Sequence, residues 1–264
     1  MAEQNTAVHW SREDEIGILT LDRPESMNAI TLESRQELCD VLGQIGREKD
    51  LRAVIITGAG KAFSAGGDLE TLASRAREFR ARGGARELFS NHMARALLDL
   101  EMPLIAAING PAVGAGLAIT LACDLRIAVH GARFGAVSTR VGLSPEYATS
   151  FLLPRIVGLT KASELVLTAR LFDAPEALAM GLIGEIVEAD ELMTRARALA
   201  HQITALPLVA VRMAKQSLRY GLDCTLTQAL SYEELAESYC LTSDDHVEAI
   251  DAFLHKRKPS FTDR

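Results

Sequence analysis

The sequence predicts an α/β core followed by an all-helical C-terminal region. Three short apolar runs have the length of buried strands, and they lie at residues 53–57, 103–108 and 125–129. Segments with apolar residues at helical spacing alternate with these runs, a pattern typical of an α/β core. From Asp190 onward only helical patterns remain. We therefore divide the chain into a core of residues 1–190 and a helical region of residues 191–264.

The composition is that of a globular protein and argues against several other classes. The chain has 264 residues, of which 48% are hydrophobic and 24% are charged. Its net charge of −7 argues against nucleic-acid binding. No apolar run reaches the roughly 18 residues of a membrane span, and the first residues lack the pattern of a signal peptide. We expect a cytoplasmic protein with no membrane partner.

The cysteines and histidines show no pattern of a disulfide framework or a metal site. Four cysteines lie far apart in the sequence with no CxxC pair, so reduced and mostly buried thiols are expected. The six histidines include no HExxH or similar spacing. We therefore expect no metal ligands in this chain.

The N-terminal elements follow from apolar spacing and from helix caps. Residues 8–11 and 16–21 are expected to form a hairpin around residues 12–15. Thr31 is a suitable N-cap for a helix that precedes the 53–57 strand. Residues 69–100 have a helical pattern that Gly83 and Gly84 interrupt.

The second half alternates briefly between strands and helices and then becomes helical. A strand is expected at 132–134, a helix at 148–156, a helix capped by Thr160, and a helix–strand step over 172–187. Helices follow at 191–206, 208–220, 226–241 and 244–256. Thr225 and Gln228 predict a capping box, and Ser243 predicts the last N-cap. Amphipathic helices at the end of a chain favour oligomerisation.

Two glycine-rich loops are the strongest functional signal. The loops at residues 58–70 and 109–116 each follow a buried strand and lead into a helix, where first-turn N–H groups lack partners. Neither is a phosphate loop, because Ala62 follows Gly60-Lys61, and Phe63 and Ile119 stand where GxGxxG needs glycine. Glycines that serve only close packing are the simpler alternative. Two such loops together favour an oxyanion hole.

Two sets of charged residues have open interpretations at this point. Five arginines follow the first loop, and they are Arg75, Arg77, Arg80, Arg82 and Arg86. They form either a solvated helix face or a contact with the phosphates of an anionic ligand. Glu146 follows Pro145 and precedes an apolar helix. Its position alone suggests a partner for the helix dipole.

Five sequence segments together resemble the crotonase (enoyl-CoA hydratase/isomerase) superfamily. They are LDRPESMNAI, KAFSAGGDL (61–69), NGPAVGAG followed by CDLRIA (109–128), FLLPRIVG (151–158) and FLHKRKPSF (253–261). The resemblance extends over nearly the whole chain. It implies the ClpP/crotonase β-β-α spiral in the core, which would hold the acyl-CoA site, and trimerisation through the C-terminal helices, often as a dimer of trimers.

The resemblance also implies an acyl-CoA substrate and assigns site residues. Coenzyme A is then part of the substrate, and no separate cofactor is implied. The backbone N–H groups of Ala65 and Ala115 would form the oxyanion hole. The remaining substrate-binding or CoA-binding residues would be Ala62, Ser64, Gly66, Gly67, Asp68 and Gly114, with Phe253 and Lys256 reaching the CoA of a neighbouring subunit.

Departures from the family pattern favour isomerisation over hydration. Hydratases of the family carry two glutamates, and the matching positions here are Ala118 and Ser138. Water addition requires both a base and an acid. Glu146 resembles the single carboxylate of Δ3,Δ2-enoyl-CoA isomerases, which removes a proton from C2 and returns it at C4. Burial beside apolar residues such as Phe151 and Leu152 should raise its pKa.

Two other functional readings remain at the level of the sequence. One is a different crotonase-fold reaction on an acyl-CoA, such as hydration or thioester hydrolysis. The other is a non-catalytic acyl-CoA-binding protein that kept the fold and lost the chemistry, because fold alone does not determine function.

Overall fold

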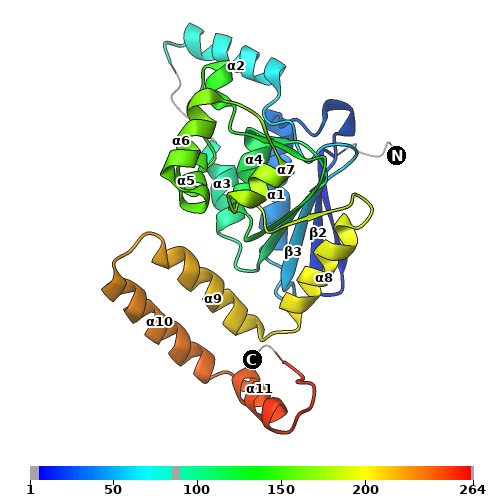
Figure 1. The fold of residues 1–264 in the computed structure, drawn as a ribbon, viewed down its shortest axis with the longest axis vertical. Helices are drawn as coiled ribbons and strands as arrows, with labels where there is room; N and C mark the ends of the chain where they lie inside the picture. The colour runs from blue at the N-terminus through cyan, green and yellow to red at the C-terminus, as the bar shows by residue number, and fades with distance from the viewer. Residues whose placement is uncertain (1–5, 85–89, 263–264) are drawn as a thin grey trace.

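A mostly parallel sheet lies at the centre of the computed structural model, which describes residues 6–84 and 90–262 (Figure 1). Its strands run in the order β1-β2-β3-β4-β6-β9. They are β1 (Val8–Glu13), β2 (Ile16–Leu21), β3 (Ala53–Gly58), β4 (Leu104–Ile108), β6 (Leu125–Val129) and β9 (Glu185–Val187). Only the β1–β2 pair is antiparallel. The fold class is therefore the predicted mixed α/β one.

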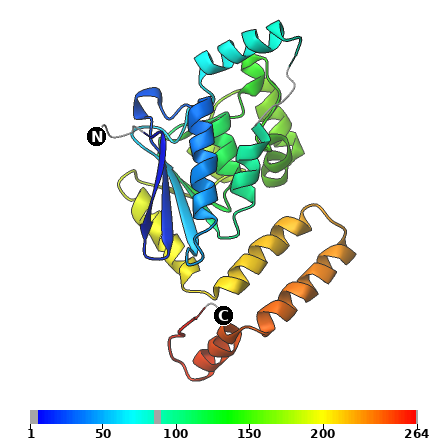
Figure 2. The ribbon, with the colours of Figure 1, turned by 180° about the vertical axis from the view of Figure 1, so that it is seen from behind.

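Helices cover both faces of this sheet, which explains why its central strands are apolar throughout. Every residue of β4 is buried, as expected for a strand between two helical layers. The helix α1 (Leu32–Ile45) lies on one face and α8 (Leu192–Thr204) on the other, as opposite views show (Figures 1 and 2). Further helices of the core are α2 (Leu69–Ala81), α3 (Ser90–Leu98), α4 (Ala115–Ala122), α5 (Thr149–Val157), α6 (Leu159–Thr168) and α7 (Ala174–Ala179).

A second, smaller sheet supports the functional loops. It consists of β5 (Ala112–Val113), β7 (Arg133–Gly135) and β8 (Phe172–Asp173). The rings of Phe134 and Phe172 stack at 5.5 Å between centroids and fix β7 against β8. Short 3-10 helices lie at η1 (Pro24–Ser26) and η2 (Ser138–Val141). Because β5 directly precedes α4, this sheet positions the start of α4.

Most predicted caps are confirmed, and several element boundaries differ from the predicted ones. Thr31 and Thr225 each form a capping box, and Ser243 accepts a hydrogen bond from the His246 amide. The helix predicted to start at Thr160 begins at Leu159 after Gly158, so Thr160 is not its cap. β1 continues to Glu13, which leaves a tighter hairpin turn at Asp14 and Glu15. The strand predicted at 132–134 is β7 (Arg133–Gly135). The helix predicted from residue 172 is preceded by the short strand β8 and begins as α7.

The last three helices extend away from the sheet. α8 packs on β2, β3, β4 and β6. By contrast, α9 (Leu208–Gly221) and α10 (Leu226–Leu241) form a hairpin that projects from the core (Figure 1). α11 (Asp244–Leu254) follows α10 on the side of the hairpin where α9 begins (Figure 1). In the described part of the chain, no helix is long and apolar enough to cross a membrane.

An ion-pair cluster around Asp124 attaches α9 to the core. The Asp124 carboxylate lies 2.8 Å from Lys215 Nζ and 2.8 Å from Arg219 Nη2, and it accepts a hydrogen bond from the Leu104 amide at 2.8 Å. Lys215 is buried and also donates to the Met102 carbonyl at 2.7 Å. Because two cations one helical turn apart meet one carboxylate at the start of β6, this cluster fixes the direction of α9.

Removing the charge of Asp124 should destabilise the fold. Asp124→Asn leaves the buried Lys215 ammonium without its counter-charge, so we expect the free energy of unfolding to fall by about 3 kcal/mol. Urea denaturation measures this loss. The control is Asp223→Asn, because Asp223 is exposed and pairs with Arg155 at 3.5 Å, which predicts a loss below about 1 kcal/mol. Equal losses in the two variants would contradict the buried-cluster account.

Candidate active site

The two glycine-rich loops lie directly against each other at the carboxyl ends of β3 and β4. Ser64 connects them, because its amide donates to the Pro111 carbonyl at 2.9 Å and its carbonyl accepts from the Val113 amide at 3.0 Å. Two glycines allow this approach. A Cβ on Gly66 would lie 2.7 Å from the Val113 oxygen, and a Cβ on Gly116 would lie 2.4 Å from the Ser64 oxygen. Both distances are shorter than packed atoms tolerate.

The second loop presents unpaired amides at the start of α4. Gly114 precedes the helix with φ of 54°, and its own amide donates to the Gly135 carbonyl at 2.9 Å. Ala115 is the first residue of α4, so its N–H has no acceptor within the helix. Among the described residues, no other group accepts from it either. Ala115 therefore offers a donor to a ligand, as predicted from the sequence.

In the first loop, the unpaired amide is that of Gly67 and not that of Ala65. The Ala65 amide donates to the Met27 carbonyl at 2.9 Å, and the Gly66 amide donates to Ser64 Oγ at 3.2 Å. The structure thus contradicts the predicted use of Ala65 as a donor. Gly67 and Ile30 form a parallel bridge. In it the Ile30 amide donates to the Gly66 carbonyl, and the Asp68 amide donates to the Ile30 carbonyl. Because N–H groups alternate in direction along an extended segment, the Gly67 amide points away from Ile30.

Two predicted contact residues of the first loop are structural. The Ala62 carbonyl accepts from Asn28 Nδ2 at 2.8 Å and from Asn109 Nδ2 at 3.2 Å. The buried Ser64 hydroxyl donates to the Asn28 carbonyl at 2.8 Å. Both side chains are also buried, so neither is available to a substrate. The two asparagines that shape the loop were missed by the sequence analysis, although each lies beside a loop-forming segment.

Asp68 begins α2 rather than projecting freely into the site. Its Oδ1 accepts a hydrogen bond from the Thr71 amide at 2.8 Å, as an N-cap does. That backbone hydrogen bond is the main cause that lowers the pKa of the Asp68 carboxyl. Asp68 thus fixes the helix that follows the Gly67 amide.

Glu146 is a half-buried carboxylate in the segment between η2 and α5. Burial raises its pKa above the ordinary value, while the positive charges of Arg75 and Arg35 lower it. Phe151 and Leu152, the apolar neighbours predicted from the sequence, do not account for the burial of Glu146. Phe151 is exposed, and both residues line a separate cavity. No other carboxylate contributes to the pKa shift of Glu146. A raised pKa makes the ionised form a stronger base.

The backbone next to Glu146 is strained. Tyr147 and Ala148 have φ of 52° and 62°, in the left-handed region that non-glycine residues seldom occupy. Burial raises the pKa of the Tyr147 hydroxyl, and the Arg35 guanidinium of α1 opposes that rise. Strain of this kind persists where surrounding contacts enforce it, and it is common at functional sites.

The family's two hydratase positions carry no acid in this fold. Ala118 is buried within the first turns of α4, next to the Ala115 amide in the helix. Ser138 starts η2, directly after the β7 segment that accepts the Gly114 hydrogen bond. Both positions therefore border the loop junction, and neither side chain can act as a general acid or base at neutral pH.

Phe253 and Lys256 are not brought to the loop junction within one chain. They lie at the end of α11, which is at the opposite end of the molecule from α2 (Figure 1). Phe253 is 82% exposed. Their expected contact with CoA therefore requires the neighbouring subunit that the sequence analysis invoked.

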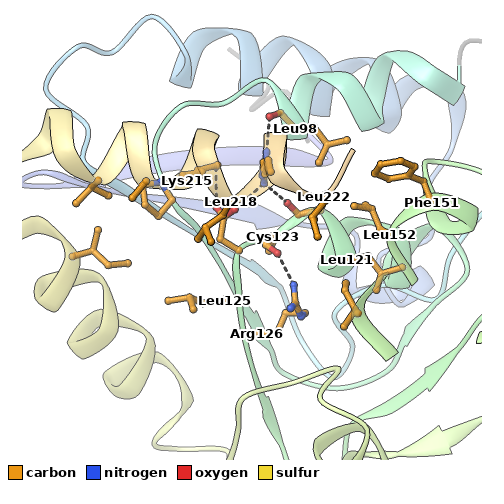
Figure 3. Close-up of a pocket in the computed structure, with 18 of the residues that line it drawn as sticks. Leu98, Leu121, Cys123, Leu125, Arg126, Phe151, Leu152, Lys215, Leu218 and Leu222 are labelled. Atoms are coloured by element: carbon orange, nitrogen blue, oxygen red, sulfur yellow. Dashed lines mark hydrogen bonds and ion pairs between the residues drawn. The ribbon is translucent and has the colours of Figure 1, made fainter. Parts of the chain in front are cut away.

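A cavity of about 680 Å³ lies between α9 and the core, away from the loop junction (Figure 3). Leu121, Cys123 and Arg126 line it from the C-terminal end of α4 and from β6, while Leu218 and Leu222 line it from the other side. Ala115 is at the opposite end of α4. The cavity is thus separate from the unpaired amides.

Two unpaired amides on abutting loops are the components of a site that stabilises an oxyanion, and Glu146 is a half-buried carboxylate in the segment before α5. Comparisons with known proteins agree with this class. The chain belongs to the enoyl-CoA hydratase/isomerase family, whose model matches residues 11–264. Its fold is that of the crotonase superfamily, and its family acts on acyl-CoA thioesters.

Relatives with both activity names cover nearly the whole chain. A short-chain-enoyl-CoA hydratase from Clostridium acetobutylicum is 37% identical, and the alignment covers 94% of this chain and 94% of that protein. A 1,2-epoxyphenylacetyl-CoA isomerase from Escherichia coli is 34% identical over 92% of this chain and 94% of its own. The crystal structure of an enoyl-CoA hydratase from Bacillus anthracis matches with a TM-score of 0.90 and 31% identity, covering 98% of this chain and 100% of that one.

A methyl group at Gly116 should force the two loops apart. Gly116→Ala places its Cβ 2.4 Å from the Ser64 oxygen, so we expect a loss of about 1–3 kcal/mol in the free energy of unfolding and a fall in turnover. The control is Gly43→Ala in α1, where nothing lies within 4 Å of the added Cβ. Alanine there should stabilise the helix by up to about 1 kcal/mol. Thermal denaturation compares the two, and a stabilised Gly116→Ala variant would contradict the described loop contact.

Proposed function

We propose that the chain converts 3-enoyl-CoA thioesters into 2-enoyl-CoA thioesters, with Glu146 as the one acid and base. The observation that carries this proposal is a single half-buried carboxylate, Glu146, in a fold whose two hydratase positions are Ala118 and Ser138. Glu146 would take a proton from C2, which leaves a dienolate. The same proton would return at C4, and the double bond would move to C2–C3. No atom is gained or lost, and no separate cofactor is needed.

Two amides would hold the negative charge of the dienolate. The thioester oxygen would accept hydrogen bonds from the N–H groups of Ala115 and Gly67, which lack partners in the described part of the chain. Each donor of such a pair contributes roughly 3–4 kcal/mol to the stabilisation of the transition state. In this arrangement Gly67 replaces Ala65 as the donor of the first loop, and the remaining backbone of residues 62–68 and Gly114 would contact CoA.

Hydration is the second candidate, and the names of the relatives favour it. The C. acetobutylicum relative is a hydratase. Hydration, however, needs one group to activate water and another to protonate the α-carbon. Ala118 and Ser138 supply neither. A hydratase would have to use Glu146 for both roles, which is why isomerisation is the better match to this site.

We also propose that α9, α10 and α11 form a homo-oligomer interface, as a homotrimer or a dimer of trimers. Large apolar side chains on these helices are exposed in the single chain, and they include Leu218, Leu226, Leu235 and Phe253 at 76%, 76%, 66% and 82%. Only Ala236 is buried on α10. An assembly would bury this surface, and it would carry Phe253 and Lys256 to the CoA of a neighbouring subunit.

Neutralising Glu146 should abolish turnover and preserve binding. Glu146→Gln keeps the shape of the side chain but cannot accept the C2 proton, so kcat with a 3-enoyl-CoA should fall by about a hundredfold or more. Calorimetry with a saturated acyl-CoA should show unchanged affinity to within a few fold. Full isomerase turnover in this variant would contradict the assignment of Glu146 as the acid and base. Loss of binding as well would indicate a structural role for Glu146.

The pH profile of the wild type tests the protonation state of Glu146. Because burial raises the pKa of Glu146, the ionised base is lost on acidification at a higher pH than for an ordinary glutamate. The acidic limb of kcat/KM should therefore have its midpoint above 4.5, the ordinary glutamate value.

A charged side chain on α10 should break the proposed assembly. Leu235→Glu places a carboxylate in the exposed apolar face of α10, and its burial between subunits would be costly. Sedimentation should show an oligomer for the wild type and smaller species for the variant. Glu237→Gln on the same helix is the control and should leave the assembly intact. A monomeric wild type would refute this part of the proposal.

A further inference from the structure

The cavity beside α9 combines an aliphatic lining with a cluster of positive charge (Figure 3). Its volume of about 680 Å³ lies within the range of small-molecule sites in proteins. Four different helices contribute aliphatic side chains to the lining, and examples are Leu121, Leu152, Ile203 and Leu218. Phe151 supplies the one aromatic ring among the described lining residues. A lining of this kind suits an alkyl chain better than a planar aromatic ligand.

The charges that line the cavity do not balance. Arg126, Lys215 and Arg219 line it as cations, and Asp124 is the only carboxylate among the described lining residues. The Asp124 carboxylate is already shared, because it lies 2.8 Å from Lys215 and 2.8 Å from Arg219. The Cys123 thiol adds no negative charge at neutral pH, since burial raises its pKa to about 12. Three cations against one carboxylate leave two positive charges uncompensated.

Arg126 is the cation of this group that has no ionic partner. Its Nε donates to the Leu182 carbonyl and its Nη1 donates to the Cys123 carbonyl, both at 2.5 Å; Figure 3 shows the second of these bonds. The two carbonyls orient the guanidinium but carry no net charge. Within residues 6–84 and 90–262, no carboxylate lies within 4 Å of Arg126, and its Nη2 forms no hydrogen bond.

The charge of Arg126 is also poorly solvated. Burial lowers the pKa of its guanidinium, and the negative charge of Asp124 offsets this effect only in part. A partly buried cation without a counter-charge is costly. An anion placed in the cavity beside Arg126 would therefore be stabilised.

The cavity is open to solvent along α9 in the single chain. Leu218 and Leu222 line it and are 76% and 54% exposed. Ala214 lines it one turn earlier on the same helix and is exposed as well. A ligand can thus reach the apolar wall from solvent without any unfolding of the core.

The arginines that follow the first glycine-rich loop offer no comparable site. Arg77, Arg80 and Arg82 of α2 are exposed, as expected for a solvated face, and Arg75 is half-buried. None of these four lines the cavity. Arg86, the fifth of that group, lies outside the described residues. Arg126 is therefore the arginine that the structure places in a cavity without an anion.

We propose that this cavity binds an unesterified fatty acid, with its alkyl chain against the aliphatic wall and its carboxylate on Arg126. A guanidinium forms charge-assisted hydrogen bonds with carboxylates and is less strongly hydrated than an ammonium, which suits a partly buried site. A thioester carries no charge at the end of its acyl chain, so a free carboxylate matches Arg126 and an acyl-CoA does not. The cavity is separate from the amides of Gly67 and Ala115, and the proposal does not depend on which reaction the chain catalyses.

Calorimetry with three probes separates the contribution of the chain from that of the charge. Wild type should bind decanoate at one site per chain, about tenfold more tightly than decan-1-ol, which lacks the charge. It should also prefer decanoate to butanoate by about tenfold or more, because butanoate lacks most of the chain. A saturating concentration of butanoyl-CoA should leave the affinity for decanoate unchanged, since the acyl-CoA site lies elsewhere.

Two variants test the two parts of the cavity. Arg126→Met should reduce the ratio of decanoate to decan-1-ol affinity to about one. Arg133→Met is its control and should retain the ratio, because Arg133 is exposed on β7 and does not line the cavity. Ala214→Trp fills the cavity from α9 and leaves Arg126 in place, so it should weaken the binding of both ten-carbon probes by about tenfold. This variant keeps the test decisive if Arg126→Met does not fold.

Each outcome supports or overturns the inference. Absence of saturable decanoate binding in the wild type would overturn it, as would a decanoate preference that survives Arg126→Met. Competition between decanoate and butanoyl-CoA would overturn it by placing the fatty acid in the acyl-CoA site. A wild type that ignores decanoate, together with smaller sedimenting species for Arg126→Met, would assign the cavity to a second copy of the chain. Decanoate binding without turnover of any enoyl-CoA would refute only the proposed reaction.

Discussion

The contact between two loops around Ser64 is the constraint on which the site depends. The amide and carbonyl of Ser64 bond to the second loop, and its hydroxyl bonds to Asn28, so three chain segments are tied at one buried residue. The approach is possible only because Gly66 and Gly116 have no side chains. Because this contact fixes both loops, the amides of Gly67 and Ala115 keep defined positions although neither has an acceptor among the described residues. Their unsatisfied hydrogen-bonding capacity is what a thioester oxyanion can use.

Opposing effects set the basicity of the Glu146 carboxylate. Burial raises the pKa of Glu146, and two arginines limit that rise. A carboxyl group that is too acidic would be a weak base, whereas one that is too basic would remain protonated at neutral pH. The left-handed backbone of Tyr147 and Ala148 holds the group in place at a cost in conformational energy. This combination suits a reaction in which one group both removes and returns a proton.

The sequence was sufficient to predict most elements and one of the two unpaired amides. The apolar runs predicted β3, β4 and β6, and side-chain caps predicted the starts of α1, α10 and α11. Ala115 was assigned through the resemblance to the family, and the structure agrees with an unpaired amide there because the first amide of a helix lacks an internal acceptor. Gly67 was predicted as a substrate-binding or CoA-binding residue but not as the donor, since the choice between Ala65 and Gly67 depends on which amides bond to Met27 and to Ile30, and these partners come from another part of the chain.

Long-range contacts also account for the other features that the sequence did not reveal. The electrostatic influence of Arg35 and Arg75 on Glu146 joins residues that are far apart in the chain, and no local pattern marks it. The same holds for Asp124 with Lys215 and Arg219. Phe151 and Leu152 were predicted beside Glu146 because they are near in sequence, but they line the cavity next to α9. Helix direction, rather than proximity in sequence, determined their environment.

The most direct test of the account is a paired assay of the purified wild type with a 3-enoyl-CoA and a 2-enoyl-CoA. A one-carboxylate isomerase predicts that the 3-enoyl substrate gives the conjugated 2-enoyl product, and that neither substrate yields 3-hydroxyacyl-CoA. Rapid formation of 3-hydroxyacyl-CoA from the 2-enoyl substrate would contradict it, because water would then be activated at a site where Ala118 and Ser138 carry no acid.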